Sequence, residues 1–314
     1  MISTKYGKVV KGLGGLYETR VKEENGEILR LASRAKGILK RDEEKVLVGD
    51  NVKITIDDTT PDGIVISEIE ERKNSLIRPP LANLDYLFIV FAAVKPSPVI
   101  ETVDKLISIA EHNKIIPVIV ITKSDLSSDA SEEYASIYRR AGFSTFITSS
   151  EAGEGLCELK EYIKNNVRDG KTAAFAGASG VGKSTLMNAL FPSLSLATAE
   201  ISRKIERGRH TTRHVEIFDI EDSEDTGFLA DTPGFSLIDF ARFDFFSLEE
   251  LLPTFREFSA YIGECKYADC AHFGEGADEC AVAKATLDGK IAPSRLESYR
   301  AIYRVLKSKN SYDK

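Results

Sequence analysis

The pattern of apolar and polar positions divides the chain into three parts. Up to about residue 71, short apolar runs alternate with glycine-containing breaks, and no long amphipathic helix interrupts them. The runs lie at 7–10, 13–19, 28–32, 46–54 and 63–69. Several short strands at this spacing predict a small β-barrel, for which an OB-like barrel is the best interpretation and a Greek-key sandwich the alternative. We expect this domain to span residues 1–71.

The second part follows a polar connector, residues 71–80, whose paired prolines favour extended backbone. Continuous apolar runs then alternate with segments of helical periodicity, which predicts a parallel sheet covered on both faces. The expected strands are 86–91, 116–121, 143–147, 172–176 and 228–230, and the expected helices are 99–113, 131–141 and 155–166. We therefore expect an α/β domain over 72–240. After about residue 240 the pattern is mostly helical and includes the helical segment 293–309. This predicts a third, helical domain over 241–314.

The composition is that of an ordinary globular protein. The 314 residues are 42% hydrophobic and 29% charged, and no apolar run approaches the ~20 residues of a membrane span. The first residues also lack the apolar run of a signal peptide, so we expect a cytoplasmic protein without a membrane partner. No coiled-coil or amphipathic dimer stripe is evident, which predicts a monomer.

The formal net charge of -7 argues against general coating of nucleic acid. The charge is uneven, however, because residues 1–41 carry ten Lys or Arg against four Glu. This excess fits an RNA-binding face and an ordinary solvated lysine-rich face equally well.

The segment 177–184, Gly-Ala-Ser-Gly-Val-Gly-Lys-Ser, fits the Walker A pattern of a phosphate-binding loop. Its glycines let backbone N–H groups close around phosphates, at the positive end of the helix that follows. Lys183 is expected to neutralise β- and γ-phosphate charge, and the Ser184 hydroxyl to coordinate Mg²⁺. A chance glycine-rich turn is the competing interpretation, and the order of apolar strand, loop and helix disfavours it. The expected nucleotide contacts are Gly177, Ala178, Ser179, Gly180, Val181, Gly182, Lys183, Ser184 and Thr185.

A second motif, Thr122-Lys123-Ser124-Asp125, follows an apolar strand and is predicted to bind guanine. The Asp125 carboxylate can accept hydrogen bonds from guanine N1 and the exocyclic amine, a donor pair that adenine lacks. Lys123 can lay its methylenes over the base. The alternative is an ordinary strand-to-helix turn capped by Asp125. The loop 148–155, with Ser149 and Ser150, is expected to support the base through backbone N–H groups.

Asp231-Thr232-Pro233-Gly234 follows another strand, about 50 residues after the phosphate loop. Asp231 is expected to hold Mg²⁺ through water, and the Gly234 N–H to contact the γ-phosphate. In an ordinary GTPase the guanine-binding motif comes last, whereas here it comes first. The motif order therefore predicts a circularly permuted GTPase that binds GTP or GDP with Mg²⁺.

The catalytic residues are predicted with less support from the pattern. Switch I is expected between 191 and 227, and Thr212 is preferred over Thr211 as its magnesium ligand. The position after the Asp-x-x-Gly motif, where Ras-like enzymes place a water-orienting glutamine, is Phe235. His210 is the leading internal candidate for catalysis, together with Lys183 and Thr212, while phosphate oxygens and bound water are alternatives. We expect slow intrinsic hydrolysis.

Three of the four cysteines lie close together near the C-terminus. Cys265-x4-Cys270-x-His272-x7-Cys280 offers three thiols and an imidazole, the ligand set of a structural zinc site. Unligated cysteines near a histidine are the alternative. Cys157 is expected to be a buried apolar residue.

Taken together, the barrel, the connector, the permuted motifs and the Cys/His tail resemble the ribosome small-subunit-dependent GTPase A family over nearly the whole chain. The resemblance implies a bacterial GTPase of late 30S subunit maturation, with the barrel and the zinc domain contacting 16S rRNA and the particle stimulating hydrolysis. It also points to His210 as important for hydrolysis. Two departures are Thr122, where the family usually has Asn, and a His272–Cys280 spacing about two residues longer than usual.

Two other functions compete with this interpretation. One is a permuted GTPase of the large subunit or a general RNA-dependent regulator, which the barrel and the zinc tail disfavour. The other is an RNA-binding scaffold that binds nucleotide without hydrolysing it, which the intact Lys183, Ser184 and Asp231 disfavour.

Overall fold

The structure is a computed structural model. It describes residues 2–36, 45–57, 59, 63–192, 215–220, 226–231, 240 and 242–310, with the backbone alone for Asp231 and Asn310. The chain divides into two compact units whose segments interleave along the sequence. The first comprises Met1–Tyr86, Glu161–Phe175 and Met187–Phe235, and the second comprises Leu87–Lys160, Ala176–Leu186 and Ser236–Lys314.

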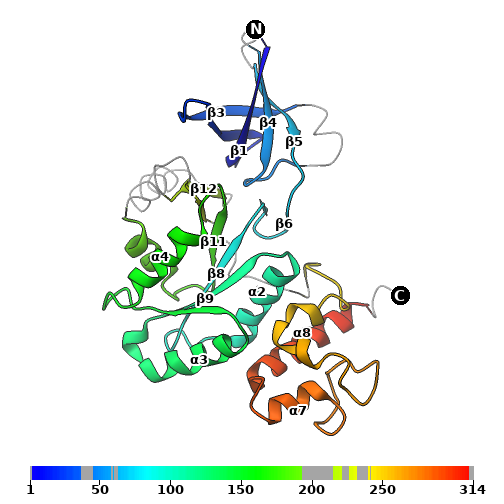
Figure 1. Cartoon of the computed structure of the whole chain (residues 1–314). Coiled ribbons are helices and arrows are strands. Elements are labelled where there is room, and N and C mark those ends of the chain that lie inside the picture. The colour runs from blue at the N-terminus through cyan, green and yellow to red at the C-terminus, as the bar shows by residue number, and fades with distance from the viewer. Residues whose placement is uncertain are drawn as a thin grey trace. The chain divides into compact units, whose positions relative to one another are not determined.

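The N-terminal part of the first unit is a five-stranded barrel, as the sequence predicted (Figure 1). Its strands run in the order β1-β2-β3-β5-β4, and β1 also pairs with β4, which closes the sheet. The β3–β5 pair is parallel and the other pairs are antiparallel. Val9, Val52, Ile54 and Ile66 are fully buried in its interior. The strands are β1 Ile2–Leu13, β2 Leu16–Lys22, β3 Ile28–Ala35, β4 Asn51–Asp57 and β5 Ile64–Ile69.

The strand boundaries differ from the predicted runs, and two of the differences lie at glycines. The run 13–19 is not one strand, because Gly14 and Gly15 adopt φ values of 59° and 84° and form the turn between β1 and β2. The run 46–54 becomes a strand only at Asn51. Gly49 precedes it with φ 94°, and a Cβ there would lie 2.1 Å from the Ala82 carbonyl oxygen.

The rest of the first unit continues this sheet. The strands β11 (Thr172–Ala176) and β13 (Phe228–Asp231) are parallel, and β12 (Glu216–Asp219) pairs antiparallel with β13. The outer edge of β12 pairs with β1 of the barrel, where Lys11 faces Glu216. The connector contributes a two-stranded sheet, β6 (Ser75–Leu76) and β7 (Leu81–Ala82).

The strands and helices expected between 86 and 166 are present, and all but Tyr86 and the end of α4 belong to the second unit (Figure 1). Its strands run in the order β10-β9-β8, with β9 and β10 parallel. All of β8 is buried, which explains its unbroken apolar sequence. The elements are β8 Tyr86–Ala92, α2 Ile100–His112, β9 Ile116–Thr122, η1 Ser124–Leu126, α3 Ser128–Arg140, β10 Ser144–Ile147, α4 Leu156–Asn166 and α5 Lys183–Leu190.

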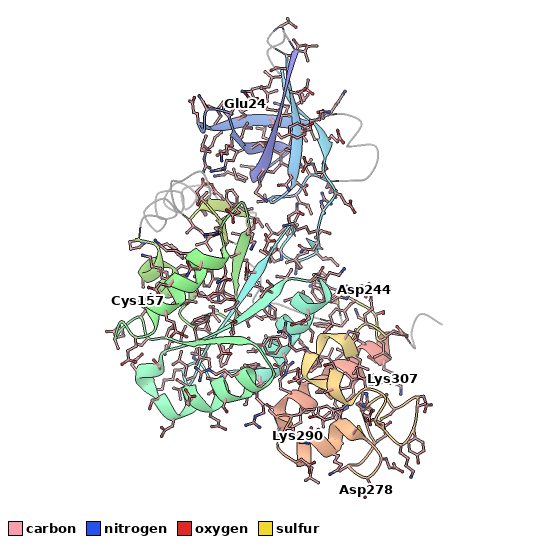
Figure 2. The ribbon with its side chains drawn as sticks, in the orientation of Figure 1. Glu24, Cys157, Asp244, Asp278, Lys290 and Lys307 are labelled. Atoms are coloured by element: carbon pink, nitrogen blue, oxygen red, sulfur yellow. The ribbon has the colours of Figure 1, made fainter. Side chains whose placement is uncertain are left out.

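The prediction that Cys157 is buried was wrong. Leu159, Ile163 and Val167 follow the helical period of α4 and are at most 1% exposed. Cys157 lies two residues before Leu159, on the opposite side of the helix, and its side chain is exposed (Figure 2).

The C-terminal part of the second unit is helical, as predicted. It contains η2 Leu252–Thr254, η3 Arg256–Tyr261, α7 Ala281–Leu287 and α8 Pro293–Asn310. None of the described helices is long and apolar enough to cross a membrane.

A fully buried arginine connects α8 with α2. Arg295 donates from Nη1 to Asp104 Oδ1 at 2.6 Å and from Nε to Glu257 Oε1 at 2.6 Å, and its guanidinium lies 4.5 Å from the centre of the Phe255 ring. Burial lowers the pKa of Arg295, but the two carboxylates outweigh it and raise that pKa overall. A buried charge paired in this way fixes the relative position of the elements that carry it, because removing one partner leaves the other charge uncompensated.

Candidate functional site

The predicted phosphate loop connects β11 to α5 and has the backbone that its glycines require. Gly177, Gly180 and Gly182 have φ values of 148°, 78° and 95°. A Cβ on Gly177 would lie 2.0 Å from the Val90 carbonyl oxygen, so no other residue fits there. Residues 178–180 are exposed at the start of α5, where backbone N–H groups are available to an anion.

Lys183 is the first residue of α5, and its side chain folds back over the loop. Its Nζ donates to the carbonyl oxygens of Gly177 at 2.7 Å and Ala178 at 2.6 Å. Burial lowers the pKa of Lys183. Ser184 and Thr185 follow in the first turn and are exposed, as hydroxyl ligands of a bound nucleotide and its metal must be.

Thr122 ends β9 and bonds directly to the phosphate loop. Its Oγ1 lies 2.6 Å from the Val181 carbonyl oxygen and 3.2 Å from the Phe91 carbonyl oxygen. Thr122 stands where the family that the sequence resembles usually has Asn. Its short, buried hydroxyl still reaches the Val181 carbonyl and joins the two loops.

Lys123 makes a second connection from the same motif. It adopts the left-handed conformation, with φ 59°, and its Nζ donates to Gly180 O at 2.8 Å and Lys95 O at 2.6 Å. The Lys95 carbonyl, in the loop after β8, was not predicted to take part. An apolar strand followed by a proline-containing loop is the only sequence signal for it.

Asp125 is oriented by the loop that follows β10. Ser149 Oγ donates to Asp125 Oδ1 at 2.5 Å and accepts from the Ala152 N–H at 3.0 Å. Gly155 closes this loop so tightly that a Cβ would lie 2.0 Å from the Ile147 carbonyl oxygen. Ser124 is buried and its N–H donates to Thr148 O at 3.2 Å, so it connects the two loops.

A cavity of about 420 Å³ lies between these loops, which is a suitable size for a nucleotide base and its sugar. It brings together residues of the base motif, the loop after β10 and the phosphate loop, although these are far apart in sequence. Glu151, from the predicted loop 148–155, also lines it, as does Leu126, which was not predicted. The lining residues are Thr122, Lys123, Asp125, Leu126, Ser150, Glu151, Gly182 and Thr185.

Several predicted residues lie outside the described part of the chain. These include both predicted switch I residues, His210 and Thr212, and the γ-phosphate residue Gly234. The backbone of Asp231 is described as the last residue of β13, paired with Glu216.

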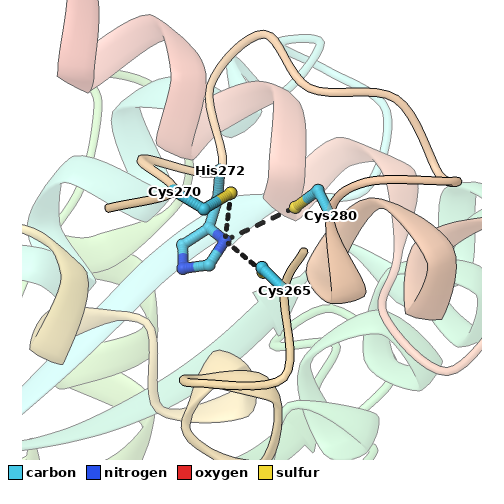
Figure 3. A group of neighbouring side chains, drawn as sticks. All are labelled: Cys265, Cys270, His272 and Cys280. Carbon is cyan, nitrogen blue, oxygen red and sulfur yellow. Dashed lines mark hydrogen bonds between the residues drawn. The ribbon is translucent and has the colours of Figure 1, made fainter. Parts of the chain in front are cut away.

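The four predicted metal ligands converge at one point (Figure 3). His272 Nδ1 lies 3.5 Å from Cys265 Sγ, 3.5 Å from Cys270 Sγ and 3.4 Å from Cys280 Sγ. In a tetrahedral site with Zn–S near 2.3 Å and Zn–N near 2.0 Å, the N–S edge measures about 3.5 Å. The residues therefore fit a zinc ion.

The protonation chemistry of the cluster agrees with this fit. Burial lowers the pKa of His272, which keeps a neutral ring nitrogen available as a ligand. Burial, and to a lesser degree the neighbouring thiols, raise the pKa of Cys270 to about 12, so three thiolates collect here only around a cation. Backbone N–H groups of Ala281 and Ala283 already point at Cys265 Sγ and Cys280 Sγ.

The long His272–Cys280 spacing is accommodated without moving the ligands apart. Between the two ligands, Glu275 Oε2 accepts from the N–H groups of Phe273 and Gly274 at 3.0 and 3.1 Å, which orders the start of this loop. The Tyr299 hydroxyl donates to Ala271 O at 2.9 Å, between two ligands, and so connects the cluster to α8.

Replacing Thr122 with valine is expected to weaken nucleotide binding, because the Val181 carbonyl loses its donor. A lost buried hydrogen bond of about 1–2 kcal/mol corresponds to roughly 5- to 30-fold in Kd. Thr122→Ser keeps the hydroxyl and is expected to bind nearly as the unchanged protein does. Titration of a fluorescent GDP analogue measures both variants, and equal affinity for Thr122→Val would contradict the role of this bond.

Replacing Cys280 with serine is expected to reduce zinc affinity by roughly 100-fold or more and to unfold the region around α7. The exposed Cys157→Ser variant provides the matched control and is expected to retain one zinc per chain. Metal analysis after dialysis against a weak chelator distinguishes them. Full zinc retention by Cys280→Ser would show that Cys280 is not a ligand.

Comparison with known proteins gives matches over the whole chain. The model of the RsgA N-terminal domain matches residues 6–65 and that of the RsgA GTPase matches residues 69–241. A protein of Bacillus subtilis, named "Small ribosomal subunit biogenesis GTPase RsgA", is 38% identical over 298 residues, covering 93% of this chain and 94% of its own. A protein of the same name from Alkaliphilus metalliredigens is 37% identical over 307 residues, covering 98% and 99%.

Two crystal structures share the fold. YloQ, described as a circularly permuted GTPase, superposes with a TM-score of 0.76 at 33% identity, covering 98% of this chain and 96% of its own. YjeQ from Thermotoga maritima superposes with a TM-score of 0.77 at 33% identity, covering 97% and 99%. Circular permutation, the N-terminal β domain and the central α/β GTPase domain are thereby confirmed. The chain belongs to the RsgA GTPase family of GTP hydrolases.

Proposed function

We propose that this protein hydrolyses GTP to GDP and phosphate during late maturation of the small ribosomal subunit, and that the 30S particle stimulates the reaction. The observation that carries the proposal is the full-length similarity, at 37–38% identity, to proteins named for small ribosomal subunit biogenesis. The assembled base and phosphate loops support the nucleotide-binding part independently, because they form one cavity from three separate segments.

In this proposal the guanine base lies in the cavity against Asp125. Its carboxylate accepts from guanine N1 and the exocyclic amine, and Ser149 holds the carboxylate in place. A carboxylate that is already oriented loses little freedom when the base binds, which favours selectivity for guanine over adenine. Lys123, Ser124 and the backbone at Ser150 complete the base site, with Thr122 connecting it to the phosphate loop.

The phosphates bind to the loop 177–184. Backbone N–H groups of the loop and of the first turn of α5, including Thr185, surround the β-phosphate, and Lys183 exchanges its contacts with Gly177 O and Ala178 O for phosphate oxygens. Ser184, Thr212 and Asp231 would hold Mg²⁺, which neutralises charge on the β- and γ-phosphates. The Gly234 N–H contacts the γ-phosphate. With Phe235 unable to orient water, His210 is proposed to act in hydrolysis, and the intrinsic rate is slow.

The barrel and the helical domain are proposed to bind the ribosomal subunit. We propose three domains, 1–71, 72–240 and 241–314, and a monomer that contacts 16S rRNA through the barrel and the helical domain. A zinc ion held by Cys265, Cys270, His272 and Cys280 stabilises the helical domain, as the separations around His272 Nδ1 support.

Hydrolysis measured with and without purified ribosomal subunits tests this function. We expect 30S subunits to raise the rate by roughly 10-fold or more, since a partner that orders the catalytic groups can contribute that much and more, and 50S subunits to have little effect. Lys183→Ala is expected to abolish both the intrinsic and the stimulated reaction. Equal stimulation by 50S subunits, or none by 30S, would contradict the proposal.

A further inference from the structure

The short strand β12 lies between the barrel and the strand that carries Asp231. On one edge it pairs with β13 at all four of its residues, from Glu216↔Asp231 to Asp219↔Phe228. On the other edge it pairs with the barrel, where Lys11 of β1 faces Glu216. Lys11, Glu216 and Asp231 therefore stand in one row across three adjacent strands.

The position of Asp231 depends on this row. The described pairing of β13 with β11 ends at Ala174↔Ala230, one residue before Asp231. The pairing with β12 extends one residue further, and within the described strands Glu216 is the partner of Asp231. Within the described strands, the backbone of Asp231 is therefore held by its pairing with Glu216.

Glu216 is in turn held by the barrel. Lys11 Nζ lies 3.0 Å from Glu216 Oε1 and 2.9 Å from Oε2, so both carboxylate oxygens accept from one ammonium group. The contact lies directly after an irregularity in β1, where the β1–β2 register shifts between Val9 and Lys11.

The opposite end of β12 is held by cations of the same domain. Asp219 Oδ1 forms an ion pair with Arg20 Nε at 2.6 Å, without hydrogen-bond alignment, and Oδ2 accepts from Arg30 Nη2 at 2.8 Å. The Arg20 guanidinium also lies 5.2 Å from the centre of the Phe228 ring, at the start of β13. Both ends of β12 are therefore attached to the barrel by charge.

We propose that Lys11 is a positioning residue for GTP hydrolysis, which acts through Glu216 on the strand position of Asp231 and so on the magnesium affinity of the nucleotide site. The inference rests on the proposed role of Asp231 as a magnesium residue. Mg²⁺ demands near-ideal octahedral geometry, so a small shift of one contributing residue weakens its binding. A partly exposed ion pair contributes little to global stability, which separates this role from folding.

The test uses the full chain and three variants, Lys11→Met, Glu216→Gln and the exchanged pair Lys11→Glu with Glu216→Lys. We expect each single change to raise the Mg²⁺ concentration for half-maximal GTP hydrolysis by roughly 3- to 10-fold. GDP affinity without Mg²⁺ stays unchanged, and the thermal midpoint stays within about 3 °C. The exchanged pair restores the magnesium dependence at least in part.

Lys5→Met is the matched control, because Lys5 lies on the same strand, faces Ile54 of β4 and forms a partly exposed ion pair with Glu23 of the same domain. It is expected to leave the magnesium dependence unchanged. Unaltered magnesium dependence in Lys11→Met and Glu216→Gln overturns the inference, as does an equal shift in Lys5→Met. Asp231→Asn distinguishes failure of the positioning role of Lys11 from failure of the proposed magnesium role of Asp231. If this variant too leaves the magnesium dependence unchanged, the role of Asp231 fails and the inference with it.

Discussion

The nucleotide site depends on hydrogen bonds that join the base motif to the phosphate loop. Thr122 bonds to the Val181 carbonyl and Lys123 to the Gly180 carbonyl, so two motifs separated by more than fifty residues meet as one surface. These hydrogen bonds depend on where the segments lie in the fold, and not on the order of the segments along the chain. Circular permutation therefore changes the connections between the loops and still allows these contacts to form.

Local chemistry made much of this site predictable from sequence. The glycines of 177–184, the carboxylate of Asp125 and the four predicted zinc ligands each have an expected function that few other residue types can perform, so their patterns are specific. Strands such as β8 were predictable because complete burial leaves an unbroken apolar run. Cys157 was mispredicted because its residue type alone does not show which side of the helix it lies on. The spacing of Leu159 and Ile163 does show which side of α4 is buried.

Long-range charge pairing could not be predicted. Arg295 meets Asp104 across 191 positions and Lys11 meets Glu216 across 205, and nothing in either local sequence selects one partner among many acids. These pairs connect elements that the motifs leave independent, α8 with α2 and the barrel with β12. The sequence thus predicts the binding groups, while the structure adds the contacts that hold them in position.

A crystal structure of the full chain with a non-hydrolysable GTP analogue and Mg²⁺ tests the assembled site most directly. The expected result places guanine N1 and the exocyclic amine within hydrogen-bond distance of the Asp125 carboxylate and the β-phosphate against Lys183. The bond from Thr122 to the Val181 carbonyl is retained. A nucleotide bound outside this cavity, or with its guanine edge turned away from Asp125, would contradict the assignment.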